Sequence, residues 1–293
     1  MPGKQVTELD ALPSFTDTSL LPVHNGAGLK KGTLTQLANY LGTKFSNPNL
    51  LINPDFKINQ RGATNYELRG YSVDRWEIWS VTVTPNKDGG ITVKNDKYKE
   101  NGYFRQHLEN ATKGDSILSC YVTSVSGTVA MVADDNSQVI LKQGLNFLHT
   151  SSSTKVFTFS LNMGASITLK WAKLEQGTVA TEFIAPSPVE EYQKCQRYFQ
   201  YIPKLYCVPL AYTRDLINLS DKYFQSTNGN FPTEMRIKPT LKYKVIGQSD
   251  GSTFTDNASL EFDSKSINTV TLSSNVSNFS ITVNEINLDA EIY

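Results

Sequence analysis

Residues 165–173, ASITLKWAK, decide the fold class of this chain. Within this segment the apolar side chains Ile167, Leu169 and Trp171 alternate with polar ones. Successive side chains of a β-strand point to opposite faces, so the alternation predicts a strand with one buried face. Residues 155–161, KVFTFSL, repeat the pattern. The chain is therefore predicted to be built from antiparallel strands.

Further alternating runs occur between Asn49 and Phe183, separated by turns rich in Ser, Asn, Asp and Gly. Six or more such strands within about 135 residues, with no helical periods between them, predict an antiparallel sandwich of the jelly-roll type. We expect residues 47–185 to form this mainly β domain. Residues 204–293 are again rich in strands and turns, and they are expected to form a smaller β domain.

One helix is predicted between the two β domains, over residues 186–203, PSPVEEYQKCQRYFQYIP. Ser187 followed by Glu190 three residues later is the pattern of a capping box, and Pro188 suits the first helical position. Pro203 disfavours helical geometry at the residue before it and is expected to end the helix.

The predicted helix carries an apolar stripe that includes Val189, Tyr192 and Phe199. Either this stripe packs on a flanking β domain, or copies of it from three chains meet around an axis. Burying four large side chains contributes roughly 6–12 kcal/mol per chain before entropy is subtracted. This free energy could help to align three chains but would hardly hold them together by itself. Contacts between the β-sheets of neighbouring chains are therefore expected to contribute to such an interface.

Residues 1–46 form a distinct leader. Thr33 can cap a short helix in which Leu34, Leu37 and Leu41 share one face. A helix of this length is marginal by itself in water. Its apolar face is therefore expected to pack on the rest of the chain or on other copies of it.

Composition narrows the classes of function. Lys plus Arg and Asp plus Glu both number 28, so no net charge would attract nucleic acid or an anionic membrane. No run of about 18 apolar residues and no secretion signal is present, and a soluble protein made in a cytoplasm is expected. Cys120, Cys195 and Cys207 form no disulfide or zinc pattern and are predicted to be buried apolar groups.

Several segments resemble a family of tail-fibre and receptor-binding proteins of bacteriophages and prophages. The resemblance covers about residues 47–293, and the leader is more weakly similar to particle-attachment leaders of phage fibres. The segment 181–188, TEFIAPSP, departs from the family pattern, as loops do. The segments that carry the resemblance are NPNLLINPDFKINQRG (47–62), YSVDRW (71–76), the run from ITLKWAK to QRYFQ (167–200), PTEMRIKPTLK (232–242) and NLDAEIY (287–293).

The resemblance implies a homotrimeric fibre protein of a virion. Its leader would attach to a phage tail protein or, alternatively, to a capsid protein, as in a head fibre of the same build. A jelly roll similar to a carbohydrate-binding module would follow, then a helix that aligns three chains, then a distal β domain facing the host. The expected ligand is a host surface glycan or protein, and no nucleic acid or membrane insertion is expected.

No catalytic or cofactor site is predicted, and the protein is expected not to be an enzyme. The histidines stand in no zinc-protease motif. A glycan-degrading tailspike would need two carboxylates about 5–9.5 Å apart, for instance among Asp74, Glu77 and Glu109. We favour ordinary surface or turn roles for these groups, and this alternative stays open. Residues 133–137, ADDNS, are expected to form a turn and no metal site.

Sugar recognition needs flat apolar faces beside a few oriented polar groups. A strand through residues 75–83 would place Trp76 on one face and Trp79, Val81 and Val83 on the other. Burial of Trp79 between subunits or under the leader is the alternative to ligand stacking. The predicted sugar contacts are Trp79, Tyr98 and Tyr103 in the jelly roll and Tyr223 and Phe224 in the distal domain.

Overall fold

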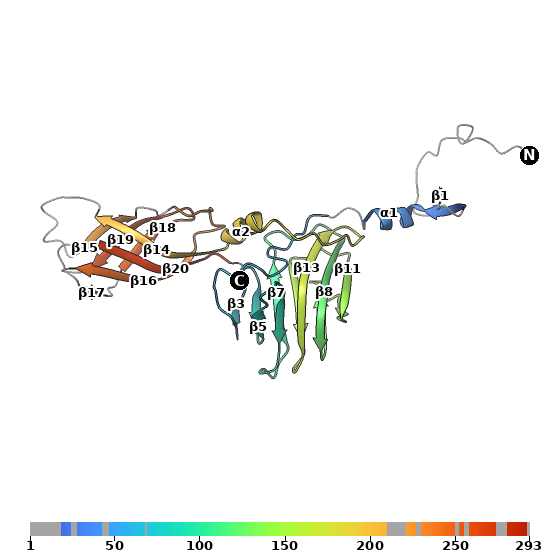
Figure 1. Cartoon of the computed structure of the whole chain (residues 1–293), viewed down its shortest axis with the longest axis horizontal. Coiled ribbons are helices and arrows are strands. Elements are labelled where there is room, and N and C mark those ends of the chain that lie inside the picture. Colours follow the sequence, from blue (N-terminus) through green and yellow to red (C-terminus); the bar gives the residue numbers. More distant parts are fainter. Residues whose placement is uncertain are drawn as a thin grey trace, which may run out of the picture.

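The chain folds into a leader, a central sandwich and a distal sheet, which follow one another along its long axis (Figure 1). The leader consists of the hairpin β1 (Leu20–His24) and β2 (Leu29–Thr33) and of the helix α1 (Leu34–Gly42). The computed structural model describes residues 19–24, 28–42, 47–67, 69–209, 221–226, 230–249, 252–254, 258–273 and 280–291. In these ranges no helix is long and apolar enough to cross a membrane.

The central sandwich has two antiparallel sheets. The six-stranded sheet, in the order β10-β9-β12-β7-β4-β3, contains β3 (Arg69–Tyr71), β4 (Glu77–Trp79), β7 (Gly102–His107), β9 (Val129–Val132), β10 (Gln138–Ile140) and β12 (Val156–Leu161). The five-stranded sheet, in the order β11-β8-β13-β6-β5, contains β5 (Thr82–Pro85), β6 (Ile91–Lys94), β8 (Ser116–Ser126), β11 (Gly144–Thr150) and β13 (Ser166–Gln176).

The pairing of these strands is nested. β6 pairs with β13, β7 with β12, β8 with β11, and β9 with β10. The chain from β6 to β13 is thus one long hairpin folded over into two sheets, which is the topology of a jelly roll. The predicted mainly β fold with a jelly-roll sandwich is confirmed.

Aromatic side chains fill the space between the two sheets. Trp76 is fully buried, and its ring stacks on Phe104 with centroids 4.7 Å apart. Phe157 and Phe159, from the alternating segment 155–161, are fully buried beside it. This segment behaves as its alternation predicts.

The segment 165–173 departs from its predicted alternation at one point. Ile167 and Leu169 face the core, but the register between β13 and β8 shifts around Lys170. A bulge inserts one residue and reverses the faces that follow it. Ala172 and Leu174 are consequently buried, and Trp171 lies on the outer face instead of beside Leu169.

The distal domain is a seven-stranded antiparallel sheet in the order β17-β16-β20-β14-β15-β19-β18. The short helix α2 (Pro188–Gln196) precedes it. The strands of this sheet are β14 (Phe199–Pro209), β15 (Asp221–Ser226), β16 (Thr240–Ser249), β17 (Ser252–Phe254), β18 (Ala258–Phe262), β19 (Ile267–Ser273) and β20 (Ser280–Asp289).

The predicted extent of the central helix is wrong. The helix ends at Gln196, and residues from Phe199 onward pair with β20 in the distal sheet. Pro203 lies within β14, where this strand pairs with β20 on one side only. On the other side β15 pairs with Cys207–Pro209 and does not reach Pro203. A proline fits there because β14 needs no second set of ladder hydrogen bonds. The side chain of Ser187 makes no cap hydrogen bond, so the helix start rests on Pro188.

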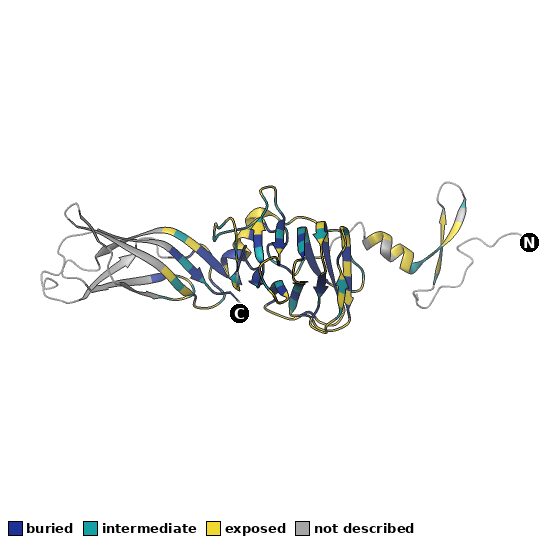
Figure 2. Cartoon of the chain, turned by 90° about the horizontal axis from the view of Figure 1, so that it is seen from below, coloured by how far each residue is buried: buried dark blue, intermediate teal, exposed yellow. Residues whose placement is uncertain are grey.

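The capping prediction for the leader helix is confirmed. The backbone N–H of Gln36 donates to Thr33 Oγ1 at 3.1 Å, and the N–H of Thr33 donates to Gln36 Oε1 at 2.9 Å. This reciprocal pair is a capping box. Leu34 is half-buried, whereas Leu37 and Leu41 are exposed, and α1 is largely exposed in Figure 2.

Candidate functional site

Two of the predicted sugar contacts lie side by side on the outer face of the six-stranded sheet. Trp79 is the cross-strand partner of Tyr103 on one side and of Arg69 on the other. Their neighbours Ile78 and Phe104 are buried, so Trp79 and Tyr103 point away from the core. The Arg69 guanidinium lies over the Trp79 ring at 4.2 Å. We call the row Arg69, Trp79 and Tyr103 the Trp79 face.

A break in the strand keeps Trp79 on this outer face. Ser80 has a φ of 51°, and after it the chain crosses from the six-stranded sheet into β5 of the other sheet. Val81 and Val83 therefore face the core from the opposite side and are fully buried. The prediction that Trp79 shares a face with these valines is wrong, because residues 75–83 are not one strand. The Nε1 of Trp79 donates to Glu100 Oε1 at 3.3 Å.

The loop that carries Tyr98 is held beside the Trp79 face. Asn95 anchors this loop through its side-chain amide, which donates to the backbone oxygens of Glu100 at 2.7 Å and Leu161 at 3.0 Å. Glu100 in turn accepts from Trp79. Tyr98 is half-buried in this loop. The three predicted contacts of the jelly roll thus belong to one region.

A charged cluster adjoins the aromatic row. Glu77 accepts from Arg105 Nε at 2.8 Å and lies 2.9 Å from His107 Nε2. Burial by itself would raise the pKa of Glu77, but the hydrogen bonds from His107 and Arg105 lower it to about 2. The carboxylate is therefore ionised at neutral pH, and the cluster is a fixed polar neighbour of Trp79.

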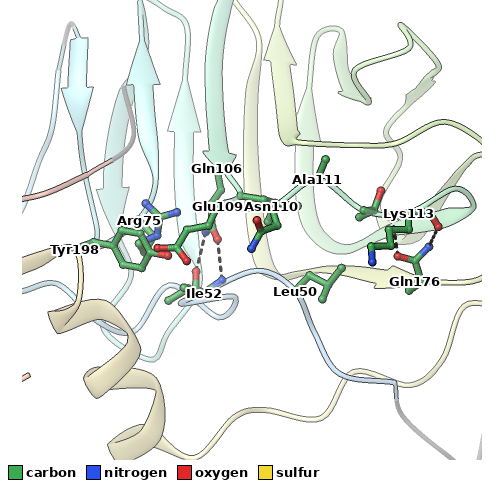
Figure 3. Close-up of a pocket in the computed structure, with 12 residues that line it drawn as sticks. Leu50, Ile52, Arg75, Gln106, Glu109, Asn110, Ala111, Lys113, Gln176 and Tyr198 are labelled. Carbon is green, nitrogen blue, oxygen red and sulfur yellow. Dashed lines mark hydrogen bonds between the residues drawn. The ribbon is translucent and has the colours of Figure 1, made fainter. Parts of the chain in front are cut away.

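A half-open groove of about 400 Å³ lies elsewhere, between the sandwich and the residues that follow α2 (Figure 3). The side-chain amide of Gln106 bridges the backbone N–H and carbonyl of Ile52, both at 2.7 Å, at its base. The lining residues are Leu50, Ile52, Arg75, Gln106, Leu108, Glu109, Asn110, Ala111, Thr112, Lys113, Gln176 and Tyr198. Of the predicted sugar contacts whose side chains the structure describes, Trp79, Tyr98 and Tyr103, none lines this groove. Sequence reasoning missed it because five separate segments form it.

Buried charges join the sandwich to the distal sheet beside this groove. Arg75 Nη1 lies 2.5 Å from Glu291 Oε2, and both side chains are buried. The Arg75 guanidinium also lies 3.6 Å from the centroid of the Tyr198 ring. Arg61 approaches Glu291 at 3.4 Å and Asp74 at 3.6 Å. We call Arg61, Asp74, Arg75, Tyr198 and Glu291 the junction.

The predicted trimer contacts of the helix are separated by the structure. Phe199 is only 3% exposed, and the Arg61 guanidinium lies 3.9 Å from its ring centroid. It belongs to β14 and not to the helix, so its assignment to the apolar stripe of the helix is wrong. Val189 and Tyr192 lie on α2 and are 69% and 42% exposed.

The carboxylates considered for a glycosidase are each engaged by neighbours. Asp74 is fully buried and accepts from the Gln60 N–H at 2.7 Å. Glu77 is buried in its cluster, and Glu109 lies 3.2 Å from Arg197 at the surface. The expectation of surface or turn roles is confirmed for Glu109 at the surface and for Asp74 in the turn 73–76. It is wrong for Glu77, which is a buried ion partner within β4.

The other predicted positions have simpler outcomes. Residues 133–137 form a turn in which the Asn136 N–H donates to the Ala133 carbonyl at 3.0 Å, as expected. Cys120 and Cys195 are buried, as predicted, and burial raises the pKa of Cys120 to about 12. Tyr223 and Phe224 lie in β15, but their side chains, like that of Cys207, fall outside the described residues.

Comparisons with known proteins place the chain in no family. No protein-family model matches it, and no curated protein gives a significant match. Among solved structures, protein Ylba from E. coli is 10% identical and covers 79% of this chain and 89% of its own, with a TM-score of 0.21.

Two other solved structures give matches of the same kind. A cycloisomaltooligosaccharide glucanotransferase from Paenibacillus sp. is 9% identical and covers 79% of this chain and 46% of its own, with a TM-score of 0.21. A mutant of Bacillus subtilis oxalate decarboxylase is 10% identical and covers 85% of this chain and 82% of its own, with a TM-score of 0.15. TM-scores this low do not establish a shared fold.

Proposed function

We propose that this chain is a structural and adhesive protein of a bacteriophage or phage-derived particle. Its leader attaches to the particle, on the tail or on the capsid, and its β domains bind a glycan or protein of the host surface. The observation that carries the adhesive part is the Trp79 face. Three side chains there point outward in one row on a jelly-roll sheet, beside a fixed charged cluster.

The Trp79 face has the properties that a sugar-binding surface requires. Aromatic rings offer apolar faces for pyranose rings, and nearby polar groups orient the hydroxyls. Arg69 and Glu100 hold Trp79 in place, and the Glu77 cluster has its own hydrogen bonds satisfied. A preformed surface of this kind loses little conformational entropy on binding.

Self-assembly into a homotrimer accompanies this function. Leu37 and Leu41 of α1 and Val189 and Tyr192 of α2 are exposed in the single chain. A short helix is marginal by itself in water, and contact between chains would cover these apolar side chains. Three weak sites on one rigid fibre raise the effective affinity by roughly two to four orders of magnitude without new contacts.

Binding to a glycan array and to host cells tests the adhesive function. Trp79→Ala and Tyr103→Ala are expected to lower binding per site roughly tenfold, since each removes a stacking ring. Ile140→Ala is the matched control, because Ile140 is an exposed apolar residue on β10 of the same sheet. Full binding by both aromatic variants would overturn the assignment of the Trp79 face.

Two further measurements address the rest of the proposal. Immunogold labelling of particles separates attachment to a tail from attachment to a capsid. Incubation with host polysaccharide, followed by a reducing-end assay, is expected to release no new ends. Release of new ends would instead identify a glycan-degrading tailspike.

A further inference from the structure

The outer face of β11, an edge strand of the five-stranded sheet, carries large apolar side chains. Asn146 and Leu148 point into the sandwich and are buried. Leu145 and Phe147 point outward and are 52% and 47% exposed. The solvated face of an antiparallel strand normally carries polar residues, whereas Leu145 and Phe147 are apolar. Something is therefore expected to cover the outer face of β11.

The apolar surface continues onto the neighbouring strands. Tyr121 on β8 is the cross-strand partner of both Leu145 and Trp171. The ring centroids of Tyr121 and Trp171 are 6.4 Å apart. The bulge at Lys170 is what brings Trp171 to this side. We call Tyr121, Leu145, Phe147 and Trp171 the β11 face.

The chain itself covers half of this face. The segment after β13 folds back over it, and Phe183 stacks on Trp171 with centroids 4.6 Å apart and planes 3° from parallel. Beside this stack, Thr181 hydrogen-bonds the buried side chains of Lys173 and Glu175. Polypeptide therefore covers the β13 side of the face.

The other half stays exposed. Tyr121, Leu145 and Phe147 lie beyond the cover, and Ile184, which follows Phe183, is exposed as well. At on the order of 100 Å² each, Tyr121, Leu145 and Phe147 present roughly 300 Å² of apolar surface. That area is within the range of the largest patch on a monomer and is somewhat under half of the ~800 Å² that one partner contributes to a standard interface.

We propose that a second copy of this chain covers the exposed half of the β11 face. This inference rests on the assembly part of the proposed function and names its contact surface within the sandwich. In a closed ring of identical chains every chain has two contact surfaces, and its two neighbours cover both. The chain offers apolar surface both here and on α1. Because its net charge is zero, no overall charge repulsion keeps two copies of the chain apart.

Molecular mass in solution tests the proposal on the full chain. Wild type is expected to have three times the 32.6 kDa of one chain in analytical ultracentrifugation. The double variant Leu145→Lys, Phe147→Lys is expected to associate at least tenfold more weakly, because two desolvated charges would enter the contact. Met163→Lys is the control, since Met163 is 67% exposed in the turn between β12 and β13. Circular dichroism of each variant reports whether it folds.

A photoreactive amino acid at position 147 provides a second measurement, which does not require the proposed contact to be disrupted. Illumination is expected to join two chains covalently there, and the same group at position 163 should give no such product. A multimer without a crosslink at position 147 would overturn this inference and leave the proposed assembly intact. A wild-type monomer at all concentrations would overturn both. Glycan binding per site by the Leu145→Lys, Phe147→Lys variant is expected to equal that of wild type. If this variant loses glycan binding while its molecular mass in solution stays unchanged, the β11 face is a ligand surface and the inference is overturned.

Discussion

At the scale of single residues, Arg75 has a backbone conformation that its residue type disfavours. Its φ is 72°, in the left-handed region, where a side chain crowds the backbone. Glu291 compensates for this, since its carboxylate accepts from the backbone N–H of Arg75 at 3.3 Å and from the guanidinium at 2.5 Å. A residue near the end of the chain therefore maintains the conformation of a turn more than two hundred positions earlier.

The neighbouring carboxyl, Asp74, predicts a pH dependence of stability. Burial, only partly offset by Arg61 and Gln60, raises the pKa of Asp74 to about 7 from an ordinary 3.8. Because the folded state holds this proton more tightly than the unfolded chain, its contribution to stability is complete below about pH 4 and is lost as the pH rises through 7.

The Asp74→Asn variant should lack this component. We expect the melting temperature of wild type to fall between pH 5 and pH 8 by at least about 3 °C more than that of the variant, a difference of roughly 1 kcal/mol. Calorimetric melts of both proteins over this range measure it. Parallel pH profiles would show that Asp74 does not carry the effect.

At the scale of elements, three strand irregularities decide which side chains are available. The bulge at Lys170 turns Trp171 outward, the positive φ of Ser80 moves the chain from one sheet to the other, and β14 begins where a longer helix was predicted. Each of them changes the phase or the type of an element, so the side chains after it face a different way. The Trp79 face depends on the crossing at Ser80, and the β11 face depends on the bulge at Lys170.

The crossing at Ser80 also requires a glycine at position 102, the first residue of β7. A Cβ atom on Gly102 would lie 2.3 Å from Val81 Cγ1 and 2.6 Å from the Ser80 carbonyl oxygen. Gly102→Ala is therefore expected to destabilise the sandwich by about 3 kcal/mol, as overpacking in a core does.

Gly114→Ala is the matched control for this substitution. Gly114 has a φ of 70° with no atom near the added carbon, so only backbone strain of about 1 kcal/mol is expected. Urea unfolding curves of the two variants provide the comparison. Equal destabilisation would contradict the close packing of β7 against the crossing.

At the scale of the whole molecule, segments far apart in the sequence meet at the junction. Asp74 and Arg75 come from YSVDRW, Arg61 from the segment that ends INQRG, and Glu291 from NLDAEIY. Arg236, from PTEMRIKPTLK, donates to the carbonyls of Ala290 and Glu291 at 3.1 and 3.2 Å. The sandwich and the distal sheet are therefore joined by buried polar contacts.

Removal of one junction charge should weaken this connection. Glu291→Gln leaves Arg75 buried without its counter-ion and is expected to cost about 3–5 kcal/mol. Calorimetry should show the single transition of wild type dividing into two, as the sandwich and the distal sheet unfold separately.

Glu109→Gln is the control for this experiment. Its partner Arg197 is half-exposed, and breaking a surface pair of this kind costs at most about 1 kcal/mol. A single transition retained in Glu291→Gln, with a loss no larger than that of the control, would show that the junction does not couple the two domains.

The sequence by itself determined the mainly β class, the sandwich and the capped leader helix, because these follow from local alternation and from hydrogen bonds between near neighbours such as Thr33 and Gln36. It also named Trp79 and Tyr103 as candidate sugar contacts, with burial of Trp79 as the alternative. Only the tertiary structure decided that the two are cross-strand partners, that Trp171 lies outside the core, and that Glu291 meets Arg75. Strand register, bulges and long-range ion pairs depend on the partner segment, and a local pattern contains no information about that partner.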